Sequence, residues 1–261
     1  MNEMNTETDT IEHHIAKEMI HITRDTNTRT THSSSPKIPK DTPMAFRMLI
    51  IDTETTGLPK KRNAPITDSS LWPHIVQVGC IVYKCPHKGF PGRILSTHNW
   101  IIRPDGWEIP VEASNIHHIT QEIAEEKGVP LMGVLQEIEK MSKDAHAICC
   151  HNVEFDVPMV LANAHRISLP IESFSKLPTL CTMTIGKPIC GEYMECKGSN
   201  GTFRKYKSPK LSELYYKLFN TYFVGRFHDA LEDCKATSEI LEKLITSYLP
   251  FVRVACPDLF H

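Results

Sequence analysis

The chain has 261 residues, of which 41% are hydrophobic and 23% charged, and its formal net charge is −2. This composition supplies ample apolar material for the core of a globular protein with one large domain or two small ones. The balanced charge excludes an overall positive field, so any contact with nucleic acid must depend on local basic groups or on metal ions.

Cysteine usage and hydropathy bear on the cellular compartment. The nine cysteines, with no hydrophobic leader and no apolar run near ~18 residues, predict a soluble, intracellular protein with reduced thiols and no membrane partner. Cytoplasm and nucleus are not distinguished. The closest cysteine pairs lack the C-x₂-C spacing with histidine partners that a zinc site needs. These pairs are Cys80 and Cys85, Cys149 and Cys150, and Cys190 and Cys196.

The N-terminal segment, residues 1–44, is rich in Thr, Ser, His and Asn. Such a segment buries too little apolar surface to offset its ordering entropy. We therefore predict that it forms a disordered tail.

The first predicted strand ends in two acidic residues. Residues 48–51 form a continuous apolar run, which is typical of a strand covered on both faces. Because side chains alternate along a strand, Asp52 and Glu54 project to one side and Thr53 to the other. Two neighbouring carboxylates repel each other and are usually neutralised by a cation, and oxygen ligands favour Mg²⁺ or Mn²⁺. The alternative is a solvated strand end whose aspartate caps a turn.

Two more strands follow a basic turn. Residues 59–65 carry their cations close to the two carboxylates and form either a contact for a phosphate backbone or a solvated loop. Residues 74–83 and 94–102 have the composition of strands, and Pro and Gly residues lie between them. Three consecutive strands with turn signals predict an antiparallel meander.

Helices dominate the rest of the chain. Apolar residues recur at helical intervals over 130–141, and residues 145–150 form a short apolar strand. The helix that follows this strand, to about residue 165, carries Asn152 and Asp156 on one face because residues four apart are neighbours.

A further strand is predicted from residue 177, followed by a loop over 186–210 that is rich in Gly and Pro. Within this loop, residues 203–207 interleave aromatic and basic side chains, which suits either nucleic-acid contact or a hairpin with solvated charges. Helices are predicted over 210–219 and 229–244.

The start of the last helix brings a histidine and two acids together. Asp229 suits the N-cap or first turn of this helix, which explains it without a catalytic role. Asp233 lies one turn later on the same face, and His228 immediately precedes the helix.

The acids form an ordered set that resembles a known family. Asp52, Glu54, Asp156 and Asp233 lie at strand ends or helix starts, where sites form in open α/β sheets. The set resembles the DEDD exonucleases, specifically the His-type, DnaQ-like branch. This branch includes the proofreading epsilon subunit of bacterial DNA polymerase III, RNase T and the mammalian three-prime repair exonucleases.

Four stretches carry the resemblance. The three motifs are DTETTGL at residues 52–58, HNVEFD at 151–156 and HDALED at 228–233. The His-x₄-Asp spacing of the third motif separates this branch from relatives that use a tyrosine. Between the motifs, IHHIT at 116–120 is similar to the family's Ile-His-Gly-Ile-Thr turn, with His118 in place of the glycine.

The resemblance implies an α/β fold, namely the ribonuclease-H-like three-layer α/β/α arrangement with a mixed five-stranded central sheet. It implies an exonuclease domain over residues 45–246 and leaves 247–261 as a C-terminal extension. Because all five catalytic positions are filled, it favours an active enzyme.

The resemblance also assigns roles to the site residues. Asp52 would bridge two divalent ions, Mg²⁺ or Mn²⁺, with Asp156 helping to hold one of them. Glu54 and Asp233 would complete the site of the ion that binds the nucleophilic water, and His228 would take the proton of this water. The residues implied to contact the substrate are Thr55, Thr56, Leu58, His117, Asn152 and Phe155.

The implied activity is the removal of nucleoside 5′-monophosphates from the 3′ end of a single-stranded or frayed nucleic acid. The family balance favours DNA, in replication proofreading or repair, with a DNA polymerase as a potential partner. Two alternatives stay open: a 3′–5′ exoribonuclease, and an exonuclease-fold accessory subunit of a polymerase complex.

Overall fold

The computed structural model of the chain describes residues 46–61, 63–86, 91–198, 201–249, 252, 253 and 256. The predicted tail at residues 1–44, Arg62 of the basic turn and most of the chain beyond residue 249 lie outside the described residues. None of the helices in these described ranges combines the length and apolar character needed to cross a membrane.

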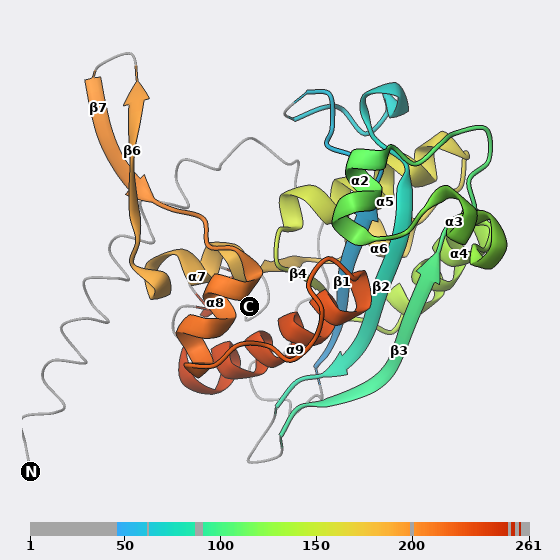
Figure 1. Cartoon of the computed structure of the whole chain (residues 1–261). Helices are drawn as coiled ribbons and strands as arrows, with labels where there is room; N and C mark the ends of the chain where they lie inside the picture. The colour runs from blue at the N-terminus through green and yellow to red at the C-terminus, as the bar shows by residue number, and fades with distance from the viewer. Residues whose placement is uncertain are drawn as a thin grey trace, which may run out of the picture.

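A five-stranded sheet in the order β3-β2-β1-β4-β5 forms the centre of the molecule (Figure 1). Its strands are β1 (Arg47–Thr55), β2 (Ile75–Lys84), β3 (Arg93–Ile101), β4 (Ala147–Cys150) and β5 (Thr179–Cys181). The first three pair antiparallel, whereas β4 is parallel to both β1 and β5. The predicted meander and the mixed five-stranded sheet are therefore confirmed.

Helices cover both faces of this sheet, as predicted for a three-layer fold. The helices are α2 (Val111–His117), α3 (Gln121–Lys127), α4 (Leu131–Ser142), α5 (Val153–Arg166), α6 (Glu172–Lys176), α7 (Thr182–Cys190), α8 (Leu211–Phe219) and α9 (Ala230–Ser247), with a short 3₁₀ turn, η1 (Ser69–Leu71).

The side chains of β1 alternate between the two hydrophobic layers. Met48 and Ile50 pack in a cluster with residues of α7, α8 and α9, whereas Leu49 and Ile51 pack with residues of α4, α5 and α6. Both layers exclude water from the strand, which explains why residues 48–51 are all apolar.

The prediction of a loop over residues 186–210 was wrong. Its first part belongs to α7, and most of the remainder forms a hairpin of β6 (Tyr193–Gly198) and β7 (Gly201–Tyr206) that projects from the body of the molecule (Figure 1). Gly186 serves helix packing, because a Cβ there would lie 2.7 Å from the Leu214 side chain. Gly191, with φ +68°, then ends α7.

Part of the C-terminal segment contributes to the core. Val252 and Cys256 are buried in the cluster that includes α9. Both lie within the predicted extension at 247–261, so its described part packs on the domain, while the boundary at residue 246 stays a prediction.

Candidate active site

The start of α9 lies directly against β2. Gly79 of β2 makes this approach possible, because a Cβ at that position would lie 2.1 Å from the Ala230 carbonyl oxygen. Gly79 is paired with Asp52 across the β1–β2 register. The close approach therefore places the third motif beside the acidic end of β1.

Asp229 is the N-cap of α9, as predicted. Its Oδ1 accepts hydrogen bonds from the backbone N–H groups of Leu231 and Glu232, at 3.1 and 3.2 Å. His228 precedes it with φ +65°, a left-handed conformation, and its backbone N–H donates to Asp233 Oδ2 at 3.2 Å. This turn fixes His228 and Asp233 relative to each other.

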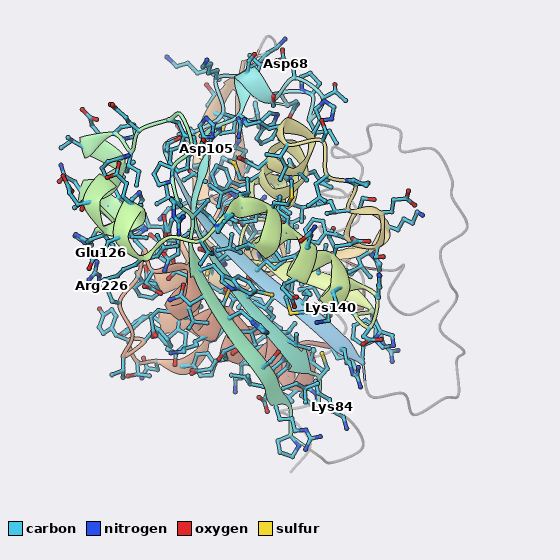
Figure 2. All side chains as sticks on the ribbon, turned by 90° about the vertical axis from the view of Figure 1, so that its right-hand side faces the viewer. Asp68, Lys84, Asp105, Glu126, Lys140 and Arg226 are labelled. Atoms are coloured by element: carbon cyan, nitrogen blue, oxygen red, sulfur yellow. The ribbon has the colours of Figure 1, made fainter. Side chains whose placement is uncertain are left out.

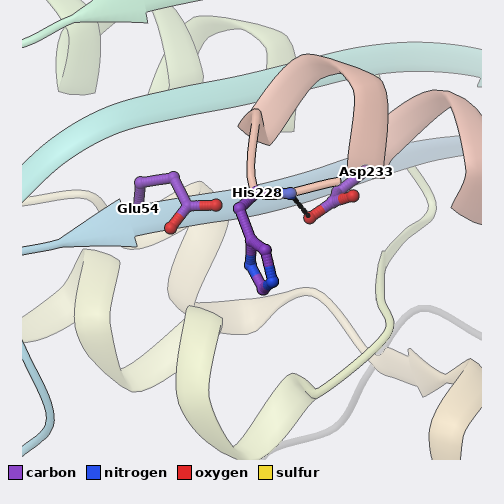
Figure 3. Close-up of side chains that lie close together, drawn as sticks. All are labelled: Glu54, His228 and Asp233. Carbon is purple, nitrogen blue, oxygen red and sulfur yellow. Dashed lines mark hydrogen bonds between the residues drawn. The ribbon is translucent and has the colours of Figure 1, made fainter. Parts of the chain in front are cut away.

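Glu54, His228 and Asp233 form the cluster of potential ligands (Figure 3). One ligand atom from each side chain lies within 4.8 Å of the other two. Glu54 is half-buried, His228 is exposed and Asp233 is buried. Glu54 is thus brought to residues that lie 174 and 179 positions later in the chain, at a point that is open to solvent at the imidazole.

Asp156 approaches from the opposite side of β1. It lies in the first turn of α5 and is only 3% exposed. Its Oδ1 accepts hydrogen bonds from the Thr53 backbone N–H at 3.0 Å and from the Thr53 hydroxyl at 2.8 Å. Thr53, which faces away from Asp52 and Glu54 as predicted, therefore holds the fourth acid.

Electrostatic coupling extends the cluster to all four acids. Burial raises the pKa of Asp52 well above its usual range, and the negative charges of Asp156, Asp233 and Glu54 raise it further. Burial, together with Asp233, Asp156 and Asp229, raises the pKa of Glu54 to about 8. Burial is also the main cause that raises the pKa values of Asp156 and Asp233 to about 7.

This donor set fits a divalent cation. The Oδ1 atom of Asp233 is buried and has no hydrogen-bond partner among the described residues. Buried carboxylates that repel one another and leave an oxygen unpaired carry a free-energy cost that a hard cation removes. Glu54, His228 and Asp233 each offer a ligand atom to such a cation, and Asp52 and Asp156 are coupled to this cluster electrostatically.

Gln77 is a supporting residue that sequence reasoning missed. It is 2% exposed and lies opposite Glu54 in the β1–β2 register. Its Nε2 donates to Asn99 Oδ1 and Asp229 Oδ2, and its Oε1 accepts from the Ala230 backbone N–H. The available signal was a single amide within the apolar run at residues 75–82.

The end of β1 and the loop after it carry three of the predicted substrate residues. The Thr55 hydroxyl donates to the Gly57 carbonyl, and Thr56 exchanges hydrogen bonds with His74. Leu58 is 80% exposed. Thr56, Leu58 and Lys60 of the basic turn line a hollow of about 400 Å³ next to this loop.

His117 lies within electrostatic range of His228. It is buried, its Nδ1 accepts the Ile119 backbone N–H at 3.1 Å, and its Nε2 has no partner among the described residues. Burial, with smaller effects of His118 and His228, lowers the pKa of His117 to about 4. His118 adopts the left-handed conformation, φ +61°, that a glycine would adopt without strain.

The remaining two predicted substrate residues lie at the start of α5. Asn152 is the N-cap residue and is half-buried, and its side chain makes no capping hydrogen bond. Phe155 is also half-buried and packs against the hydrophobic cluster on the α5 side. The described contacts of Asn152 and Phe155 belong to the helix start and to the hydrophobic core.

Comparison with known proteins identifies a family and a relative of this chain. The sequence matches the RNase T family model, described as exonuclease, over residues 49–241. The PolC-type DNA polymerase III of Caldanaerobacter subterraneus subsp. tengcongensis is 26% identical over 201 residues, which are 76% of this chain but only 11% of the polymerase.

Solved structures of Exonuclease I share the fold. The E. coli enzyme in complex with a dT13 oligonucleotide has a TM-score of 0.56 and 18% identity, over 78% of this chain and 42% of that one. A moderately thermophilic Exonuclease I from Methylocaldum szegediense has a TM-score of 0.57 and 14% identity, over 80% and 42%. This chain therefore spans less than half of these relatives, and the ribonuclease-H-like fold is confirmed.

The family match covers most of the chain and includes all three acidic motifs. The chain therefore belongs to the RNase T exonuclease family and is a DnaQ-like exonuclease.

Proposed function

We propose that the chain is a metal-dependent 3′–5′ exonuclease that releases nucleoside 5′-monophosphates from single-stranded or frayed 3′ ends of DNA, in proofreading or repair. The observation that supports this most is the convergence of Glu54, His228 and Asp233 within 4.8 Å. Asp52 and Asp156 are electrostatically coupled to the same cluster.

The four carboxylates would hold two divalent ions, Mg²⁺ or Mn²⁺. When bound, such ions supply activation of a water molecule and stabilisation of the charge on the leaving oxygen. The exposed imidazole of His228 lies beside Glu54 and Asp233 and would accept the proton of that water. Thr53 holds Asp156 in position by donating two hydrogen bonds to it, and these hydrogen bonds favour the ionised form against the effect of burial.

The loop at Thr55, Thr56 and Leu58 would provide the preference for a 3′ end. Leu58 is exposed four residues after Glu54, and its side chain could pack beside a terminal base. A terminal base that frays easily costs less to unstack, so single strands and mismatched ends should be cut faster than paired ends.

A polarity assay tests the proposal. With a 5′-labelled single strand and Mg²⁺, we expect a ladder of progressively shorter labelled products and release of nucleoside 5′-monophosphates, which EDTA abolishes. Asp52→Asn should lower the rate at least about 100-fold because it removes a carboxylate that is proposed to hold the metal ions. Asp105→Asn, at an exposed acid outside the cluster, is the matched control and should cut normally. Undiminished cleavage in EDTA or by Asp52→Asn would count against the mechanism.

His228 is tested separately. His228→Gln should lose about 10²–10⁴-fold in rate, the usual contribution of a general base. It should still bind Mn²⁺, measured by calorimetry, because the carboxylates are intact. A variant that cuts at the normal rate would show that His228 has only a structural role.

DNA is favoured over RNA by the relatives. The E. coli Exonuclease I structure contains dT13, and the PolC-type relative is a DNA polymerase. Digestion of matched DNA and RNA oligomers distinguishes an exodeoxyribonuclease from an exoribonuclease. Co-purification with a DNA polymerase tests the further proposal that the chain acts as a subunit of a polymerase complex.

A further inference from the structure

A second hollow, of about 550 Å³, lies at the opposite end of the sheet from the acidic cluster. It is lined by Arg47 at the start of β1, Lys84 at the end of β2 and Arg93 at the start of β3. Figure 2 shows Lys84 at one end of the strands and Asp105 towards the other. At about 3.3 Å per residue, Arg47 and Asp52 are separated by about 17 Å along β1.

The three cations are in register across neighbouring strands. Arg47 is paired with Lys84, and Lys84 with Arg93, so the three side chains lie in one row on the same face of the sheet. Like charges directly opposite each other on a sheet are destabilising. None of the three takes part in an ion pair found within the described residues.

The segment after α4 completes the hollow. Lys143 adds a fourth cation, and Asp144 is the acid among the lining residues. His146 Nδ1 accepts the Arg47 backbone N–H at 3.2 Å, so the neutral ring carries its proton at Nε2 and can donate there. The lining therefore combines four cations and a further donor with one carboxylate.

We infer that this hollow, named here the basic hollow, binds phosphate groups of a nucleic-acid backbone at a site separate from the catalytic carboxylates. Guanidinium groups match phosphate in geometry and charge, and a phosphate would relieve the repulsion along the row. Among the described residues, the lining offers no Phe, Tyr or Trp ring for base stacking, so contacts to phosphates would be independent of sequence. Because the chain has a net charge of −2, this attraction is local.

The inference rests on the proposed function only because it takes nucleic acid as the source of the phosphates. A binding experiment in EDTA tests the basic hollow independently of the exonuclease activity, because it requires no cleavage. Full-length chain is titrated against fluorescein-labelled (dT)₂₀ by fluorescence anisotropy at several salt concentrations. The variant Arg47→Gln/Lys84→Gln/Arg93→Gln removes the row of cations.

We expect the variant to bind more weakly and with a shallower salt dependence. Each phosphate contact on a single strand contributes about 0.7 to the slope of log K against log salt, so losing three contacts should reduce the slope by about 2. A thermal melt checks that the variant is folded, and it should melt no lower than the original chain because a repulsion has been removed.

The matched control, Lys127→Gln/Lys176→Gln/Lys217→Gln, removes the same charge from exposed helix positions. It should leave the slope within the error of the original chain. An unchanged slope in the Arg47, Lys84 and Arg93 variant overturns the inference, and so does an equal loss in the control, because either result means that the basic hollow makes no particular contact. Loss of cleavage in the polarity assay alone would affect only the proposed function.

Discussion

At the residue scale, Gln77 connects the sheet to the turn that carries His228 and Asp233. One buried amide contacts the N-cap Asp229, the Ala230 backbone and Asn99 of β3. Because Ala230 begins α9, these hydrogen bonds hold the helix start that carries His228 and Asp233. Gln77 is therefore a positioning residue, because it sets where two proposed catalytic groups lie.

Replacing Gln77 tests this role. Gln77→Met keeps the length of the side chain but leaves the Ala230 N–H without its buried acceptor, which should cost about 1–3 kcal/mol of stability. We expect kcat to fall at least about 10-fold with little change in KM, since small misplacements of catalytic groups are costly. Gln136→Met, at an exposed position of α4, is the control. Equal kinetics for both variants would contradict a positioning role.

At the scale of elements, the contact between β2 and α9 determines whether the site forms. Gly79 allows backbone atoms of the two elements to approach more closely than any other residue would permit. The same contact places Asp233 near Glu54, although the two belong to different layers of the fold.

Gly79→Ala should therefore disrupt the site. The new methyl group would meet the Ala230 carbonyl, so α9 must shift, at a cost of about 1–3 kcal/mol or more, and exonuclease activity should fall with it. Gly133→Ala is the matched control, because a Cβ at this exposed position of α4 meets nothing within 4 Å. That change should be neutral or stabilising by about 0.4–1 kcal/mol. Denaturant titration and the polarity assay measure both effects, and an active, fully stable Gly79→Ala chain would refute the contact's importance.

At the scale of the whole molecule, the clustered acids link stability to pH and metal. The pKa of Glu54 is raised to about 8, and those of Asp156 and Asp233 to about 7. The folded chain therefore binds these protons more tightly than the unfolded chain. Their contribution to stability is present below about pH 4 and is lost as pH rises through the folded values, between about 4 and 8.

Divalent metal should compensate for this loss. At 100 times its dissociation constant, a cation that binds only the folded chain adds about 2.7 kcal/mol, and each kcal/mol raises the Tm of a chain of this size by roughly 2–4 °C. We expect Mg²⁺ to raise the Tm by about 5–10 °C over EDTA at pH 8.5, and by less at pH 6, where protons compete. In EDTA at pH 8.5, Asp52→Asn should melt above the original chain, because one repelling charge is gone. A Tm that is independent of Mg²⁺ would contradict a cation site.

Local patterns predicted much of the fold and the identity of the acids. The apolar run at 48–51, the strand and helix periodicities and the spacing within each motif predicted the meander, the main helices and the Asp229 N-cap. They did not predict α7, because Gly186 and Pro188 are typical of loops. In the structure, Gly186 lies within a helix because the Leu214 side chain of α8 packs directly against it.

The sequence by itself determined which residues could carry the chemistry, because the order and spacing of side chains along a strand or helix follow from backbone geometry. Only the tertiary structure decided how these residues meet. Thr53 and Asp156 are 103 positions apart, Gln77 and Ala230 153 apart, and the row of Arg47, Lys84 and Arg93 depends on strand register. Such contacts depend on how distant elements pack, which no local pattern specifies.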